Sequence, residues 1–124
     1  MPSDLRLTRI GDRMRQELSL MLVREEIHDP RLAGLMVTEV KVDRELSYAD
    51  IYVSALEGSE RSKEVLPVLE GASGFIRKLL SERIELRSFP RLRFHWDITP
   101  ERAERIERLL AEIRQEESKG KKKA

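Results

Sequence analysis

Residues 69–97 read LEGASGFIRKLLSERIELRSFPRLRFHWD, and this stretch decides the fold. It predicts a helix that is interrupted near two glycines, Gly71 and Gly74, begins again, and leads through a basic connection into an alternating strand. Glycine leaves the backbone free of bulky side chains, and the unpaired N–H groups at a helix start favour anions. The stretch therefore predicts a phosphate-binding corner, and with it a nucleic-acid binder rather than an enzyme.

Four residues at this corner are candidates for phosphate contact. Ser73 and Gly74 stand where the helix begins again, and Arg77 and Lys78 follow one turn later. The alternative is that the glycines only permit a tight turn between two helices. The two basic side chains beside the helix start favour the binding interpretation, because they can neutralise a nucleic-acid backbone.

The charge of the chain is segregated, although its net value is only +1. Residues 71–96 carry six basic and two acidic side chains, whereas residues 43–70 carry three basic and seven acidic ones. A basic region beside an acidic one can orient a protein on a polyanion. Five further arginines are candidates to extend the RNA-binding surface, two in the third predicted strand and three along one side of the first helix: Arg91, Arg93, Arg6, Arg9 and Arg13.

Length and composition predict a single domain without catalytic or metal chemistry. At 124 residues the chain can bury one hydrophobic core. It has no cysteine, which excludes disulfides, thiolate zinc sites and cysteine nucleophiles. Its two histidines are isolated, so we expect neither a metal nor another cofactor. The polar N-terminus has no apolar signal segment, which predicts a cytoplasmic protein.

Hydrophobic periodicity predicts the order helix, strand, strand, helix, helix, strand, helix. A right-handed crossover should make the second and third strands parallel, so that helices cover one face of a three-stranded mixed sheet. Residues 1–117 would form the domain, and the Lys-rich residues 118–124 a flexible tail. The expected elements cover roughly residues 5–26, 35–42, 48–55 and 60–70, a helix after residue 74, a strand over 91–98 and a last helix from Thr99.

The same periodicity assigns side chains to faces of these elements. In the first strand we expect Met36, Thr38, Val40 and Val42 to share one face. The helix after residue 74 should bury Phe75, Ile76, Leu79 and Leu80. The last helix carries an apolar stripe made of Ile106, Leu109, Leu110 and Ile113.

The element order, with a glycine-containing turn between the two central helices, resembles the type II KH domain, an α+β RNA-binding fold. Further motifs resemble one family, bacterial ribosome-binding factor A, over residues 5 to about 113. These motifs are Arg9-Ile10, Asp29-Pro30-Arg31, Val37-Thr38-x-Val40-x-Val42, Tyr52-Val53-Ser54, Gly74-Phe75-Ile76-Arg77, Arg83-Ile84-x-Leu86-Arg87, Pro90-x-Leu92-x-Phe94-x-x-Asp97 and Arg105-Ile106-Glu107-x-Leu109-Leu110.

Two positions depart from the pattern of that family. Its members have an Ala-x-Gly helix kink, which Ala72-Ser73-Gly74 matches, but Gly71 also completes a Gly-x-x-Gly loop motif. The sequence therefore fits either a kink or an open loop over residues 71–74. Members also often have glycine near the start of the last helix, where this chain has Ala103.

The resemblance implies a non-enzymatic assembly factor that binds the immature small ribosomal subunit and its rRNA. It further implies support of late maturation, processing of the rRNA 5′ end, adaptation to cold, and release with help from a ribosome-associated GTPase. We expect a monomer without a membrane partner. The alternative is a protein–protein adaptor that uses the acidic residues 43–70 or the last helix and does not bind RNA. A DNA-binding module is disfavoured, because the basic residues do not line one recognition helix.

Overall fold

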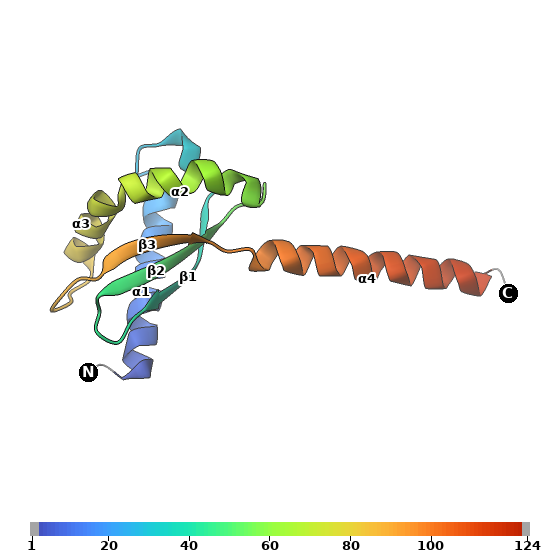
Figure 1. The fold of residues 1–124 in the computed structure, drawn as a ribbon, viewed down its shortest axis with the longest axis horizontal. Helices are drawn as coiled ribbons and strands as arrows, with labels where there is room; N and C mark the ends of the chain where they lie inside the picture. The colour runs from blue at the N-terminus through green and yellow to red at the C-terminus, as the bar shows by residue number, and fades with distance from the viewer. Residues whose placement is uncertain (1–2, 123–124) are drawn as a thin grey trace.

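A computed structural model describes residues 3–122 and has the predicted order αββααβ followed by one more helix (Figure 1). Two short 3-10 turns, Pro30–Leu32 and Ser59–Arg61, lie in the connections. The main elements are α1 (Asp4–Val23), β1 (Met36–Val42), β2 (Tyr48–Ser54), α2 (Ser62–Gly71), α3 (Ser73–Arg83), β3 (Arg91–Trp96) and α4 (Thr99–Lys122).

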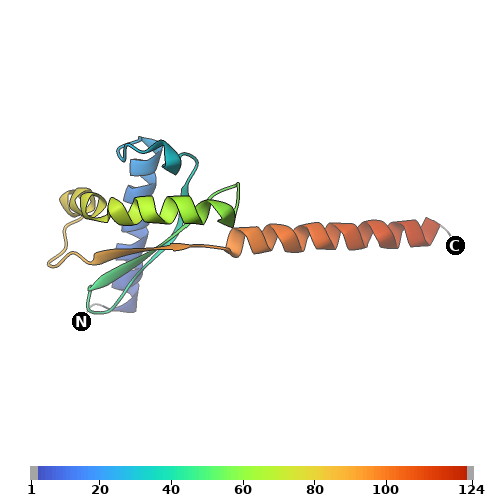
Figure 2. The same ribbon diagram turned by 45° about the horizontal axis from the view of Figure 1, so that its top comes forward.

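The sheet has the strand order β1-β2-β3. β1 pairs with β2 antiparallel, and β2 pairs with β3 parallel. Helices α1, α2 and α3 lie on one face of this sheet, as the views in Figures 1 and 2 show. The predicted type II KH-like α+β fold with a mixed three-stranded sheet is therefore confirmed.

The core lies between the sheet and helices α1, α2 and α3. The hydroxyl of Ser3 caps α1 by accepting a hydrogen bond from the Arg6 amide, 3.2 Å away. Gly11 brings the helix close to β1, because a Cβ atom there would overlap the carbonyl oxygen of Val40. One apolar face of α1 is buried at helical spacing, consisting of Leu7, Ile10, Met14, Leu18 and Met21.

The central strand β2 matches the predicted alternation. Ala49, Ile51 and Val53 are almost completely buried and face the helices. In the neighbouring strand β3, Leu92 and Phe94 are buried on the same face of the sheet. Burial alternates with a period of two from Tyr48 to Val53, and Ser54 at the end of the strand is buried as well.

The prediction for β1 was wrong at Met36. The register with β2 shifts between Val37 and Glu39, so that Thr38 is an extra residue in a β-bulge. The bulge changes which side chains face the helices: Val37 and Val40 are buried, whereas Met36 is 44% exposed. A sequence pattern of period two does not reveal such an insertion.

Helix α3 buries fewer side chains than predicted. Ile76 and Leu80 are completely buried, and they lie one turn apart on one side of the helix. Phe75 is 50% exposed, so its assignment to the buried side was wrong. Its side chain is rotated by about 100° around the helix from that of Ile76 and leaves the core.

Helix α4 extends away from the rest of the molecule (Figures 1 and 2). It includes residues 118–122, where the sequence predicted a flexible tail, whereas residues 123–124 lie outside the described part of the chain. No proline or glycine occurs over residues 101–119, and Glu116 and Lys119 are good helix formers, which favours continuation of the helix. No helix within residues 3–122 combines the length and apolarity that a membrane span requires.

Candidate nucleic-acid interface

The break between α2 and α3 is a kink at one residue and not an open loop. α2 ends at Gly71, Ala72 has φ −93° and ψ 0°, and α3 begins at Ser73. The Ala72 amide still donates to the Val68 carbonyl over 3.0 Å, and the Ala72 carbonyl accepts from the Ile76 amide over 2.9 Å. Ala72 therefore ends the hydrogen-bonded ladder of α2 and begins that of α3, and the helix direction changes at this one residue.

Neither glycine at the kink is required by the conformation of the backbone. Among the described residues, positive φ values at glycine occur only at Gly34 and Gly58. A Cβ atom added at Gly71 or Gly74 would meet no other atom within 4 Å. Gly74 therefore leaves bare, solvent-facing backbone in the first turn of α3, where N–H groups attract anions.

Arg77 connects α3 to the segment before β3. Its Nε donates to the carbonyl of Pro90 over 3.1 Å, and its Nη2 donates to the carbonyl of Phe89 over 2.6 Å. Both acceptors are neutral carbonyl oxygens, so these bonds hold the guanidinium in a fixed orientation without compensating its positive charge. Further N–H donors of this exposed side chain remain for a ligand.

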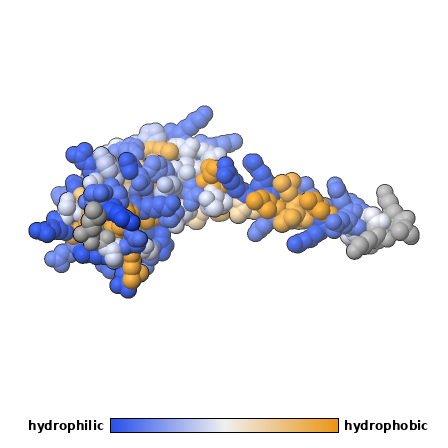
Figure 3. Space-filling view, turned by 60° about the horizontal axis from the view of Figure 1, so that its bottom comes forward, coloured by the Kyte–Doolittle hydropathy of each residue, from blue (hydrophilic) through white to orange (hydrophobic). Residues whose placement is uncertain are grey.

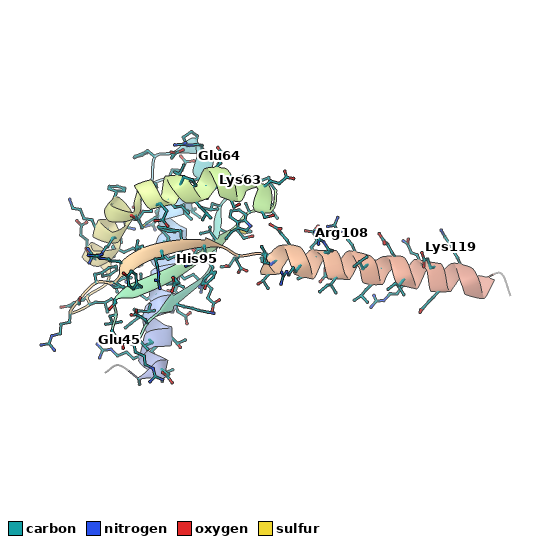
Figure 4. All side chains as sticks on the ribbon, viewed as in Figure 1. Glu45, Lys63, Glu64, His95, Arg108 and Lys119 are labelled. Atoms are coloured by element: carbon teal, nitrogen blue, oxygen red, sulfur yellow. The ribbon has the colours of Figure 1, made fainter. Side chains whose placement is uncertain are left out.

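Arg77 and Arg91 line the same shallow groove, which has a volume of about 380 Å³. The groove lies between the turn after β1, which contains Glu45 (labelled in Figure 4), and the segment before β3. The Arg91 amide joins the two sides by donating to the Ser47 carbonyl over 2.9 Å. Lys78 follows Arg77 on α3, is exposed, and has no ion pair among residues 3–122.

The structure separates Arg93 from Arg77, Arg91 and Lys78. Its Nε and Nη2 donate to the two carboxylate oxygens of Asp50 over 2.9 and 3.1 Å, and its guanidinium lies 4.1 Å from the ring centre of Tyr48. Asp50 also lies 2.7 Å from Nε2 of His95, which is labelled in Figure 4. Arg93 is therefore largely neutralised on the sheet face opposite the helices.

The pKa of Asp50 reflects these partners. Burial raises the pKa of this carboxyl group, but hydrogen bonds and charge from Arg93 and His95 outweigh burial and hold it below its ordinary value. The ring of His95 also stacks on Tyr52, with the ring centres 5.1 Å apart. The open sheet face thus has an ordered network of polar and aromatic side chains.

The three candidate arginines of α1, Arg6, Arg9 and Arg13, are exposed but differ in their partners. Arg13 forms an ion pair with Glu17 over 3.2 Å, and Glu17 also lies 3.9 Å from Arg83 of α3. Arg6 and Arg9 have no ion pair within the described residues. These two side chains retain uncompensated charge for a polyanion.

Sequence reasoning missed the partners of three carboxylates that organise the fold. Asp50 lies opposite Arg93 in the β2–β3 register, a signal that could be read only once the parallel register was known. Glu26 accepts from Arg83 over 2.7 Å, and this bond lowers the pKa of Glu26. Asp97 accepts from the Thr38 hydroxyl over 2.6 Å and from the Thr99 amide over 2.9 Å. It therefore connects the start of α4 to β1.

No group of three or more His, Asp or Glu side chains within residues 3–122 has an arrangement suited to a metal ion. Five of the candidate residues lie on α3 or at the start of β3 and are defined here as the kink surface: Ser73, Gly74, Arg77, Lys78 and Arg91. The kink surface combines bare backbone at a helix start with cationic side chains from α3 and β3. This combination is suited to binding phosphate groups.

Comparisons with known proteins agree with the resemblance found in the sequence. Residues 6–110 match the family model described as ribosome-binding factor A. The chain is 40% identical over 119 residues to ribosome-binding factor A of Hahella chejuensis, covering 91% of this chain and 87% of that protein. It is 47% identical over 107 residues to the protein of the same name from Acinetobacter baylyi, covering 80% of each chain.

Solved structures give the same result. The crystal structure of ribosome-binding factor A from Thermus thermophilus has a TM-score of 0.62 and 27% sequence identity, covering 72% of this chain and 93% of that one. A homology model of the Thermus thermophilus factor, fitted into a cryo-electron microscopy map of a complex with 30S, has a TM-score of 0.53 and 29% identity. It covers 70% of this chain and 96% of that one.

Proposed function

This chain belongs to the ribosome-binding factor A family, and we propose that it binds the small ribosomal subunit by placing rRNA phosphates on the kink surface. One observation carries the assignment of the surface. Arg77 and Arg91 line one groove, Lys78 follows Arg77 on α3 without an ion pair in the described part of the chain, and Gly74 lies one turn before Arg77 on exposed backbone. The complex of a similar Thermus thermophilus factor with 30S supports the choice of partner.

The kink surface binds a phosphate by three kinds of contact. Backbone N–H groups in the first turn of α3 and the hydroxyl of Ser73 donate hydrogen bonds. Arg77, already oriented by two carbonyls, provides a charge-assisted donor without losing much side-chain freedom on binding. Lys78 and Arg91 add positive charge on either side of it.

Other basic residues extend this surface to different degrees. Arg6 and Arg9 contribute full charges to the RNA-binding surface, because both are exposed and lack an ion pair within residues 3–122. Arg13 and Arg93 contribute less, because Glu17 and Asp50 already neutralise them. Because the uncompensated positive charge differs across the surface, it orients the protein on rRNA without making every face bind RNA.

The biological role proposed here is assembly without catalysis. The chain, acting as a monomer in the cytoplasm without a cofactor, binds the immature particle and holds an rRNA segment in or away from a given pairing. It thereby supports late maturation and processing of the rRNA 5′ end. The role is greatest in the cold, where wrong pairings persist longer. A ribosome-associated GTPase then releases it.

Charge reversal at the kink surface tests this proposal. We choose Lys78→Glu with Arg91→Glu and leave Arg77 intact, because Arg77 also holds the segment before β3 in place. The matched control is Lys63→Glu with Arg108→Glu, which changes the net charge equally at exposed positions on α2 and α4 (Figure 4). Co-sedimentation with free small subunits is measured over a range of salt concentrations.

The first double variant should bind weakly, and the slope of log affinity against log salt should fall by about two, roughly one per lost phosphate contact. The control should keep the wild-type slope. Equal losses in both double variants would show general charge repulsion and contradict the assignment of the surface. If the folded wild-type protein binds no ribosomal particle, the adaptor hypothesis replaces the proposal.

A further inference from the structure

The apolar stripe of α4, made of Ile106, Leu109, Leu110 and Ile113, is left uncovered by the fold. Its four side chains are 47–57% exposed. The space-filling view in Figure 3 shows a hydrophobic patch on the extended helix, surrounded by hydrophilic residues. We propose that a second copy of this chain covers the stripe by pairing α4 with α4 in antiparallel orientation.

The charges at the two ends of the stripe specify a second copy in this orientation. Arg102 stands four residues before Ile106, and Glu117 stands four residues after Ile113, so both continue the line of the stripe. An antiparallel pair with two-fold symmetry places Ile106 opposite Ile113 of the second copy. Arg102 then faces Glu117 of that copy, whereas parallel pairing would place Arg102 beside Arg102.

The charges along the sides of the stripe fit the same register. At about 100° per residue, Arg105, Glu112 and Glu116 lie along one side of the stripe. Two-fold symmetry places Arg105 between Glu112 and Glu116 of the second copy. On the other side, Arg114 lies near Glu107 of that copy. None of these five residues has an ion pair among residues 3–122, so all are available to the second copy.

The geometry of the molecule permits this pairing. Residue 99, where α4 begins, would lie beside residue 120 of the second copy, about 30 Å along the helix from the other molecule's sheet and helices. The two bodies therefore do not collide. Four half-exposed side chains offer far less than the roughly 800 Å² per partner of a stable interface. The dimer is therefore weak, forms at high protein concentration, and dissociates to the monomer that acts on a particle.

Disulfide cross-linking tests the orientation directly, because the native chain has no cysteine. Ile106→Cys and Ile113→Cys are prepared as separate full-length variants and oxidised alone and as an equal mixture at high concentration. The antiparallel register predicts a cross-linked dimer in the mixture and almost none in either variant alone, because bridging requires close Cα atoms. Cross-linking of each variant with itself, or no cross-linking at all, overturns the proposal.

Charge exchange tests the ends of the stripe. Arg102→Glu and Glu117→Arg should each reduce the dimer fraction in sedimentation velocity at high concentration, and the double variant should restore it. Arg108→Glu, on the opposite side of α4, is the matched control and should behave as wild type. A wild-type protein that remains monomeric at every concentration overturns the proposal. If Leu110→Asp then weakens particle binding, the occupant is a component of the particle instead.

Discussion

Helices α1 and α4 have the same kind of apolar pattern but opposite environments. In α1, Met14 and Leu18 are 0% and 1% exposed against the sheet. In α4, Leu109 and Leu110 are about half exposed on a helix that extends into solvent. Periodicity shows which face of a helix is apolar, and only the tertiary structure shows what covers that face. The first helix therefore stabilises the fold, and the last one is free to act on another molecule.

The largest expected effect comes from making the same substitution in both helices. Leu18→Ala should lower the free energy of unfolding by about 2–5 kcal/mol, because it leaves a cavity in the core. Leu110→Ala should change it by less than about 0.5 kcal/mol, because the side chain is already half in water. Urea unfolding at low protein concentration, where the proposed dimer is dissociated, measures both. A loss above about 2 kcal/mol for Leu110→Ala would show that α4 packs on the body.

Replacing one glycine in α1 and one in α4 tests the same comparison between these helices, and the expected effect on stability is intermediate. In Gly11→Ala, the new methyl group would overlap the Val40 carbonyl and push α1 from β1, which should destabilise the fold by about 1–3 kcal/mol. In Gly120→Ala, the methyl group meets no atom of the described residues within 4 Å, and alanine favours helix. Thermal unfolding should show a lower midpoint for the first variant and an unchanged one for the second. Equal midpoints would contradict the close approach of α1 to the sheet.

The smallest expected effect on the free energy of unfolding comes from neutralising a carboxylate that has an ion-pair partner, compared with neutralising one on α4. Asp50→Asn removes the negative charge and one of the two oxygens that accept from Arg93, and it should cost only about 1 kcal/mol, because Arg93 is half exposed to solvent. Glu104→Gln on α4 removes a carboxylate that has no ion pair among residues 3–122 and should cost nothing measurable. Denaturant unfolding at neutral pH compares the two variants.

The dependence of stability on acidic pH should also show the contribution of the paired carboxylate Asp50. The pKa of Asp50 is lower in the folded protein than in the unfolded chain. Its contribution to stability is therefore present above pH ~4 and is lost as the pH falls through the folded value. The stability of Asp50→Asn should fall less steeply in acid than that of the wild type. Identical pH profiles would mean that the ion pair with Arg93 does not form in solution.

The sequence was sufficient where local periodicity and packing agree. Ala49, Ile51 and Val53 alternate in the central strand, and all are buried as predicted. It was insufficient where the structure depends on a partner distant in the sequence. The bulge at Thr38 and the exposed Phe75 follow from how β1 and α3 pack against other elements, which no local pattern encodes.

The candidate site also has features that the sequence predicted and features that only the structure shows. The sequence placed Ser73, Gly74 and Lys78 at the start of one helix, and the structure has them there. It assigned Arg77 to the corner and treated Arg91 and Arg93 alike, as residues that extend the surface. The structure instead shows Arg77 bonded to neutral carbonyls, Arg91 at the groove, and Arg93 paired with Asp50. Which charges remain for RNA depends on contacts between strands and helices, and RNA binding by these residues stays a prediction.

The β-bulge in β1 has a consequence for solubility. In a sheet of three strands, two are edges, and a regular edge can template pairing with strands of other molecules and so seed aggregates. The shifted register between Val37 and Glu39 interrupts the regular row of backbone donors and acceptors along this edge, and the exposed Glu39 and Lys41 place charges beside it. The irregularity that brings Val37 into the core thus also protects the chain from growing into a larger sheet.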